Sequence, residues 1–179
     1  MLNKDDNERL VRVGAGTEMG QLIRLYWIPF LLSSDVQSDD QPYRVRLLGE
    51  DLVAFRDNKG NVGLVDFACP HRGAPMVFGR NEEGGLRCVY HGWKFGANGQ
   101  CKEMPAEPAN SPMPSRTVIK SYPVRERNGV LWTYMGPAPV PELPVHEPFT
   151  RSNCFREIAI SDVPCNWFQC QENSIDPVH

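Results

Sequence analysis

The sequence predicts a mainly β fold of antiparallel sheets, with an N-terminal helix and the incomplete start of an α+β domain at the C-terminal end. Three observations lead to this prediction. Short stretches of alternating apolar and polar residues, separated by Gly- and Asn-containing turns, follow one another from Tyr43 to Tyr134. Apolar residues between positions 17 and 28 follow a helical period instead. Five prolines between positions 137 and 148 indicate a stiff, extended linker.

The first predicted element is a helix within an N-terminal segment, residues 1–36. Thr17 is a suitable N-cap. One apolar helical face follows it at spacings i, i+3, i+4, i+7 and i+8, made of Met19, Leu22, Ile23, Tyr26 and Trp27. Pro29 is expected to end the helix, because proline cannot donate a backbone hydrogen bond.

The β domain is expected over residues 37–136. Its strands and hairpin turns are predicted at 43–47, 52–55, 62–66, 93–95, 118–124 and 130–134, with turns at 97–100 and at Asn128-Gly129. The linker covers 137–150. In the incomplete second domain, 151–179, residues 155–160 alternate as a strand and Pro164 is expected to begin a helix.

Composition and charge exclude several classes of function. The net charge is −3 and the basic residues are dispersed, which does not indicate a nucleic-acid partner. The longest apolar run, 26–32, contains a proline and is too short to span a membrane, and the charged N-terminus is not a secretory signal. Four further cysteines show no disulfide spacing and are expected to be reduced, partly buried thiols: Cys101, Cys154, Cys165 and Cys170. We therefore expect a cytoplasmic protein without a membrane partner.

The strongest chemical signal is a pair of short motifs that each combine one cysteine with one histidine. Cys69 and His71 form C-x-H, and Cys88 and His91 form C-x-x-H, with sixteen residues between His71 and Cys88. Four Cys and His ligands satisfy tetrahedral zinc, but zinc motifs usually place like ligands in the same arm. One cysteine and one histidine in each arm favour a two-iron cluster, in which the cysteines bind one iron and the histidines the other.

A second, weaker signal lies at the C-terminal end. Asp176 and His179 are three residues apart, so a helix would present both on one side. A carboxylate that accepts from one imidazole nitrogen prepares the other nitrogen to bind a metal. Pro177 disfavours helical geometry at Asp176. Taken alone, these residues are more typical of a solvated helix end than of a metal site.

Both signals resemble one family. Cys69-Pro70-His71-Arg72-Gly73 and Cys88-Val89-Tyr90-His91-Gly92-Trp93-Lys94-Phe95 resemble the cluster loops of Rieske non-haem iron aromatic ring-hydroxylating oxygenases, and Asn166-Trp167 through His179 resembles the start of their catalytic domain. The resemblance covers nearly the whole chain and is closest to the phthalate 4,5-dioxygenase-like oxygenase (alpha) components. It implies a Rieske [2Fe–2S] cluster bound by Cys69, His71, Cys88 and His91. It also implies that His179 is the first ligand of a mononuclear iron, that Asp176 bridges this iron to His91 of a neighbouring subunit, and that Asn173 lies near the iron.

The function implied by the resemblance is that of an enzyme, the oxygenase component of a multicomponent system. A separate reductase or ferredoxin delivers electrons from NAD(P)H to the cluster, which passes them to the mononuclear Fe(II) within a homotrimer or hexamer. O2 is activated there to hydroxylate or dihydroxylate an aromatic acid, or to demethylate an aryl ether.

A 2-His-1-carboxylate iron site needs three protein ligands, of which the chain carries only His179. We therefore expect the front part of a longer oxygenase. Two alternatives stay open: a Rieske ferredoxin-type electron carrier without oxygenase activity, and a zinc-binding structural module.

Overall fold

The structure, a computed structural model, describes residues 2–38 and 40–178. The strands are β1 (Trp27–Leu32), β2 (Tyr43–Leu47), β3 (Glu50–Arg56), β4 (Val62–Asp66), β5 (Arg80–Glu82), β6 (Gly85–Arg87), β7 (Lys94–Phe95), β8 (Cys101–Glu103), β9 (Ser121–Tyr122), β10 (Val124–Arg127) and β11 (Val130–Tyr134). The helices are α1 (Lys4–Val11), α2 (Glu18–Ile23), α3 (Met113–Arg116), α4 (Glu147–Thr150) and α5 (Trp167–Ile175), with 3₁₀ turns η1 (Ser33–Asp35) and η2 (Met76–Phe78).

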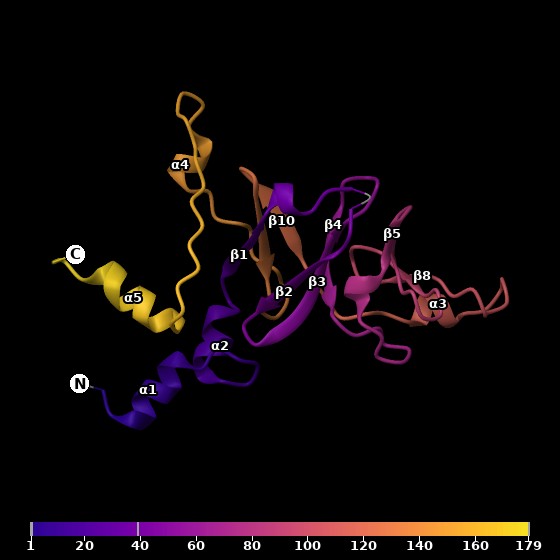
Figure 1. Ribbon diagram of the computed structural model, residues 1–179, viewed down its shortest axis with the longest axis horizontal. Coiled ribbons are helices and arrows are strands. Elements are labelled where there is room, and N and C mark those ends of the chain that lie inside the picture. Colours follow the sequence, from indigo (N-terminus) through magenta and orange to yellow (C-terminus); the bar gives the residue numbers. More distant parts are fainter. Residues whose placement is uncertain (1, 39, 179) are drawn as a thin grey trace.

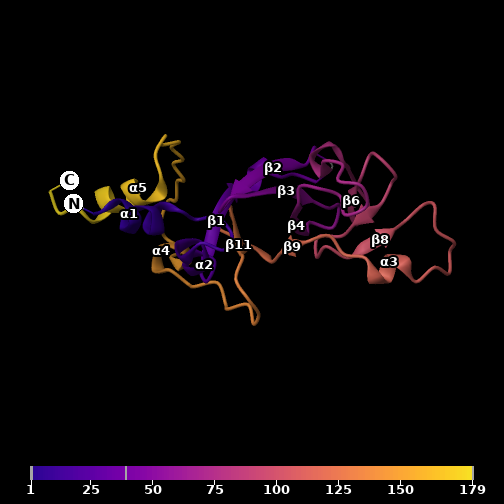
Figure 2. The same cartoon turned by 90° about the horizontal axis from the view of Figure 1, so that it is seen from below.

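The strands form three sheets, in the orders β1-β11-β10, β2-β3-β4-β9 and β5-β6-β7-β8. All strand pairs within these sheets are antiparallel, which confirms the predicted fold class. The sheet β5–β8 lies at one end of the molecule, and helices α1 and α5 lie side by side at the other (Figures 1 and 2). No helix within the described ranges is long and apolar enough to cross a membrane.

The predicted N-terminal helix begins as expected and ends early. The hydroxyl of Thr17 accepts a hydrogen bond from the Gly20 N–H (3.1 Å), and α2 ends at Ile23. The helical assignment of Tyr26 and Trp27 was wrong, because Trp27 begins strand β1, which pairs only with β11 at the edge of its sheet. Pro29 is tolerated in this edge strand next to a shift in register, where no ladder donor is required.

A half-buried ionic cluster attaches helix α2 to the central sheet, which is the sheet β2-β3-β4-β9. Arg24 pairs with Glu50 at 2.7 Å, and Lys120 and Tyr122 also contact this carboxylate. Burial alone would raise the pKa of Glu50, but the hydrogen bonds from Lys120 and Tyr122 and the charge on Arg24 outweigh it and lower the pKa. The carboxylate is therefore ionised in the folded protein at neutral pH.

The β hairpins follow the predicted turns, with one correction. Asn128 and Gly129 adopt φ values of 52° and 77° between β10 and β11, the left-handed conformation that a tight two-residue hairpin requires. The stretch predicted as one strand over 118–124 is divided at Pro123, because β9 pairs with β4 whereas β10 pairs with β11. The Pro123 carbonyl accepts from the Thr133 hydroxyl at 3.0 Å and anchors the crossing between the two sheets.

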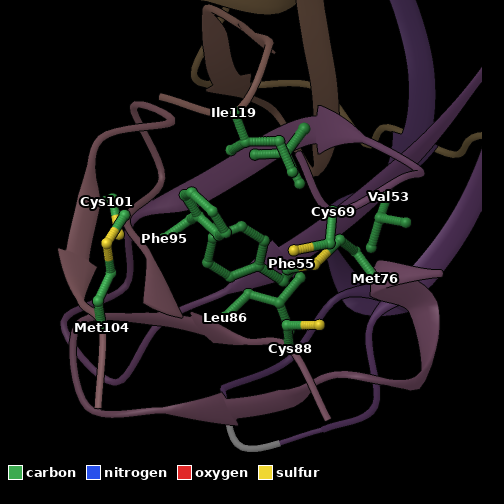
Figure 3. Packing of buried hydrophobic residues seen from close by; sticks show 11 residues of the cluster. Val53, Phe55, Cys69, Met76, Leu86, Cys88, Phe95, Cys101, Met104 and Ile119 are labelled. Carbon is green, nitrogen blue, oxygen red and sulfur yellow. The ribbon is translucent and has the colours of Figure 1, made fainter. Parts of the chain in front are cut away.

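A hydrophobic core lies between sheet β2-β3-β4-β9 and sheet β5–β8. It contains Cys69 and Cys88, the two cysteines of the candidate site. Figure 3 shows this apolar cluster, in which Cys69 and Cys88 lie among Phe55, Met76, Leu86, Phe95 and other buried side chains. Cys101 is buried in the same cluster, whereas Cys154, Cys165 and Cys170 are exposed, which corrects the expectation that all four remaining thiols are partly buried.

The prolines after β11 run along the sheet β1-β11-β10 and are tied to it. The indole of Trp27 donates to the Pro141 carbonyl (3.0 Å), and Arg127 donates to the carbonyls of Leu143 (3.1 Å) and Pro144 (2.8 Å). Because three carbonyls of this segment accept hydrogen bonds from the sheet, this part of the linker is held against it.

The C-terminal segment differs from its prediction in three places. Residues 155–160 form no strand, since no described segment offers them a ladder partner. Helix α5 begins at Trp167, three residues after Pro164, with Asn166 as the N-cap that accepts from the N–H groups of Phe168 and Gln169. The helix ends at Ile175, so Asp176 is a C-cap in extended conformation, and the other residue of the predicted pair, His179, lies outside the described residues.

Candidate metal centre

The two candidate ligand loops have the same backbone frame. In the first loop, the Cys69 carbonyl accepts from the Gly73 N–H (2.8 Å) and the Cys69 N–H donates to the Ala74 carbonyl (2.9 Å). In the second, the Cys88 carbonyl accepts from the Gly92 N–H (3.0 Å) and the Cys88 N–H donates to the Trp93 carbonyl (2.9 Å). Each loop is therefore a five-residue turn that begins with a cysteine and ends with a glycine.

The glycine at the end of each turn is required by the backbone conformation. Gly73 and Gly92 adopt φ values of 71° and 75°, in the left-handed region that glycine occupies without strain. The histidine is the third residue of the first turn and the fourth residue of the second. The C-x-H and C-x-x-H spacings are therefore two placements of histidine on one kind of turn.

The two cysteines form a buried thiol pair. Cys69 is 3% exposed and Cys88 is 2% exposed, and the two thiols are near enough for Cys88 to raise the pKa of Cys69. Burial raises the pKa of Cys69 to about 11, although the backbone N–H groups of His71 and Arg72 donate to its sulfur and act in the opposite direction. Ionised sulfur in this core is thus disfavoured unless a cation compensates for it.

The two histidines, one from each loop, form a pair at the surface, where both side chains are exposed. Their ring centroids lie 4.6 Å apart at an interplanar angle of 63°. The ring of His71 is also stacked on Trp93, with centroids 4.4 Å apart and planes 6° apart, and the ring of Tyr90 lies 3.9 Å from that of His91. His71 of the first loop is thereby inserted between Trp93 and His91 of the second.

The imidazole of His71 is biased toward its neutral form. Desolvation by the neighbouring groups lowers the pKa of this exposed ring, and the charges of the nearby His91 and Arg72 lower it further. Neutral imidazole is the form that binds metals. The ring row of Trp93, His71, His91 and Tyr90 therefore holds the two imidazoles in a fixed relative orientation.

An ionic network of Arg87, Lys94, Glu82 and Glu103 contacts the second loop through the Gly92 carbonyl. The guanidinium of Arg87 donates to the Gly92 carbonyl (2.6 Å), to Glu82 (2.6 Å) and to Glu103. The buried ammonium of Lys94 pairs with the same Glu103. The hydrogen bonds from Arg87 lower the pKa of Glu82, and those from Lys94 and then Arg87 lower the pKa of Glu103. Both carboxylates are thus ionised partners of the two cations.

The arrangement of the four donors fits a two-iron cluster better than a single tetrahedral ion. No three His, Cys, Asp or Glu side chains converge on a single-ion position within the described part of the chain. The donors instead form one buried sulfur pair and one exposed nitrogen pair. A Rieske cluster requires this separation, with two thiolates on one iron and two imidazoles on the other, and its ferric ions would offset the cost of ionising the buried thiols.

A surface hollow of about 800 Å³ contains none of the four candidate ligands in its lining. Its lining comes from the distal hairpin turns and includes Lys59, Lys102 and Arg125. The chemistry of the chain is therefore concentrated at the loop tips and not in this hollow.

The C-terminal candidates lie elsewhere. Asn173 is exposed on α5, and the carboxylate of Asp176 accepts from the Val178 N–H at 2.9 Å. Figures 1 and 2 show α5 at the opposite end of the molecule from sheet β5–β8, which carries the second loop. Asp176 and His91 of one chain are therefore not brought together, and His179 lies outside the described residues.

Two supporting residues were missed by the sequence reasoning. Trp93 was assigned only to a strand, and Arg87 was given no role. The signal available for Arg87 was its position directly before Cys88. For Trp93, the partner His71 belongs to the other loop, so that contact is visible only in three dimensions.

A buried cysteine pair and an exposed histidine pair on two equivalent turns define an iron–sulfur protein of the Rieske class. The chain belongs to the Rieske [2Fe–2S] domain family, which matches residues 26–123. Its cofactor is a Rieske cluster.

The resemblance to oxygenase subunits is also confirmed. The chain is 52% identical, over its full length, to the 5,5'-dehydrodivanillate O-demethylase oxygenase subunit of Sphingobium sp. (strain NBRC 103272 / SYK-6). It is 44% identical, again over its full length, to the phthalate 4,5-dioxygenase oxygenase subunit of Pseudomonas putida. The chain spans 43% and 41% of the lengths of these two relatives. The crystal structure of dicamba monooxygenase with non-haem iron and dicamba superposes with a TM-score of 0.60 at 30% identity, covering 68% of this chain and 36% of that one.

Proposed function

We propose that the chain belongs to the oxygenase component of a multicomponent Rieske non-haem iron oxygenase. The observation that carries this proposal is the extent of the similarity. The 52% identity to an O-demethylase oxygenase subunit covers the whole chain, whereas the Rieske match ends at residue 123. An electron carrier that consisted of a Rieske domain alone would give no reason for similarity across the linker and α5.

In this proposal Cys69 and Cys88 bind one iron of the cluster and His71 and His91 bind the other. When bound, the cluster supplies one-electron transfer and a mononuclear Fe(II) supplies the activation of O2. The buried thiols exclude water from one side of the cluster, and the exposed imidazoles form the side through which electrons enter and leave. Trp93 and the Arg87 network hold the imidazole-bearing turns in place.

The C-terminal residues are proposed to begin the oxygen-activating domain. His179 is the first ligand of the mononuclear iron, Asn173 lies near it, and Asp176 links it to His91 of a neighbouring subunit. What supports an intersubunit link is the separation of α5 from the cluster loops within one chain. A homotrimer or a hexamer of stacked trimers would provide that neighbour.

The substrate class proposed is an aromatic acid or an aryl ether. Ring hydroxylation, ring dihydroxylation and O-demethylation are the corresponding reactions, and the names of the two relatives include a dioxygenase and an O-demethylase. Electrons are proposed to come from NAD(P)H through a separate reductase or ferredoxin, since both relatives are named as oxygenase subunits.

We further propose the domain division 1–36, 37–136, 137–150 and 151–179, and a cytoplasmic location. The anchored linker supports a boundary after β11, because residues 137–146 contain no helix or strand. Cysteine usage supports the location, since the sequence shows no disulfide-scaffold spacing.

The test is turnover by the full-length polypeptide with a reductase and NADH, measured as O2 uptake and product formation on phthalate and on methoxylated aromatic acids. The visible spectrum and the iron content are recorded on the same sample. We expect a red-brown protein with about three irons per chain and substrate-dependent O2 uptake.

Two other results would replace the proposal. A red-brown protein with about two irons that transfers electrons without consuming O2 would be a ferredoxin-type carrier. A colourless protein that contains zinc would be a structural module.

A further inference from the structure

Two thiols meet at the beginning of helix α5. The sulfurs of Cys165 and Cys170 lie 3.6 Å apart, and neither residue belongs to the candidate metal centre. Both cysteines are exposed in the described chain. Their contact is local, since it joins the residue before the N-cap to the first turns of one helix.

The local geometry explains why these sulfurs meet. Asn166 is the N-cap, so Cys165 occupies position N′ and Cys170 occupies position N4. These are the two positions whose side chains pack together in a hydrophobic staple. The cap is well formed, because the Asn166 side chain accepts from the N–H groups of Phe168 (3.0 Å) and Gln169 (3.2 Å). The backbone therefore brings the two sulfurs close before any bond between them exists.

We propose that Cys165 and Cys170 are a redox-active dithiol that closes to a disulfide across the first turns of α5. The sulfurs must approach from 3.6 Å to the bonding distance of about 2 Å, which rotation about the side-chain bonds can provide. Disulfides of reducing compartments are usually transient or regulatory. The Cys165–Cys170 disulfide is therefore a reversible link across the start of α5. This proposal does not depend on the proposed oxygenase activity.

The reaction partner is a low-molecular-weight disulfide such as oxidised glutathione. One cysteine thiolate attacks it, forms a mixed disulfide and releases one glutathione. The second cysteine then attacks the protein sulfur of that mixed disulfide and releases the second glutathione. The dithiol loses two electrons and two protons, and the electrons reduce the disulfide bond of the oxidant to two thiols.

The consequence for the fold is a covalent link in place of a van der Waals contact. Helix α5 is held to the N-terminal region by the hydrogen bond from the Trp167 indole to the Leu10 carbonyl (2.9 Å). Closing the staple fixes the turn before Trp167, so fraying of the first turn decreases. Asn173 and Asp176 lie downstream on the same helix and at its end.

The test uses the full-length protein equilibrated in glutathione buffers of increasing oxidised fraction, acid-quenched, alkylated in denaturant and cleaved after Lys and Arg. No Lys or Arg occurs between residues 157 and 179, so Cys165 and Cys170 fall on one fragment. Cys154, an exposed thiol, falls on the separate fragment 152–156 and is the internal control.

We expect the fragment with both cysteines to lose two hydrogens and to resist alkylation, with full reversal by reductant. Cys170→Ser and Cys165→Ser should each stop at a mixed disulfide with one glutathione, as Cys154 does. Hydrogen exchange in α5 should slow several-fold on oxidation of the wild-type protein but not of Cys170→Ser. Alkylation of both cysteines at every buffer ratio, or addition of two glutathiones to the wild-type fragment, would overturn the proposal.

Discussion

The contact between Arg87 and the second ligand loop leads to a prediction about cluster retention. Arg87 is 14% exposed and donates to the Gly92 carbonyl, which follows His91 directly, as well as to Glu82 and Glu103. Replacement by Gln removes the positive charge and at least two of these hydrogen bonds. The Gly92 carbonyl loses its side-chain partner, so the turn that carries His91 loses its hydrogen bond to the ionic network.

The magnitude follows from the exposure of the partners. The side chains of Glu82 and Glu103 are 32% and 47% exposed, so solvent screens their attraction and each pair contributes about 0.5–1 kcal/mol. The hydrogen bond to the Gly92 carbonyl is worth about 1 kcal/mol. Arg87→Gln should therefore lower the free energy of unfolding by about 2–3 kcal/mol, and Arg87→Lys, which keeps the charge, by less.

Arg80→Gln is the matched control. Arg80 also pairs with Glu82 (3.0 Å), but its side chain is 61% exposed and, within the described residues, it makes no hydrogen bond or ion pair with the ligand loop. Its removal should cost no more than about 0.5 kcal/mol. Urea unfolding gives the free energies, and the rate at which the visible cluster spectrum bleaches at fixed temperature reports on the loop.

The expected order of bleaching rates is Arg87→Gln fastest, then Arg87→Lys, then Arg80→Gln and wild type together. Equal bleaching rates in Arg87→Gln and Arg80→Gln would refute the loop-support argument. Equal losses of unfolding free energy would show that only the shared partner Glu82 matters.

Three further predictions concern other parts of the chain. Glu50 has a lowered pKa in the folded protein, so its contribution to stability is present above the ordinary value of 4.5 and is lost as the pH falls through the folded pKa. Glu50→Gln should flatten the loss of stability below pH 4.5 in acid titrations followed by circular dichroism; an unchanged profile would exclude this role. Trp93→Leu removes the ring stack on His71, which is worth about 0.5–1.5 kcal/mol. It should alter the electron paramagnetic resonance spectrum of the reduced cluster, and Trp93→Phe should alter that spectrum less. Identical spectra would mean that the stack does not orient His71. Asp176→Asn in the full-length enzyme should abolish turnover and leave the cluster spectrum intact, and normal turnover would remove the bridging role.

Much of the β domain was predictable because its elements are specified locally. The strand beginning at Tyr43 follows from the alternation of apolar residues with arginine, and the hairpin at Asn128-Gly129 follows from two residues that tolerate positive φ. The errors arose where a tertiary partner decided the outcome. Tyr26 and Trp27 fit a helical period, but pairing with β11 drew Trp27 into a strand.

The sequence by itself also determined the chemistry of the candidate site. The types and spacing of Cys69, His71, Cys88 and His91 were sufficient to favour a two-iron cluster over zinc, because ligand chemistry is a property of side chains. Only the tertiary structure decided that the sulfurs are buried while the imidazoles are exposed, and that His71 lies between two rings of the other loop. Burial and ring stacking depend on which distant segments pack together, and local sequence does not specify that.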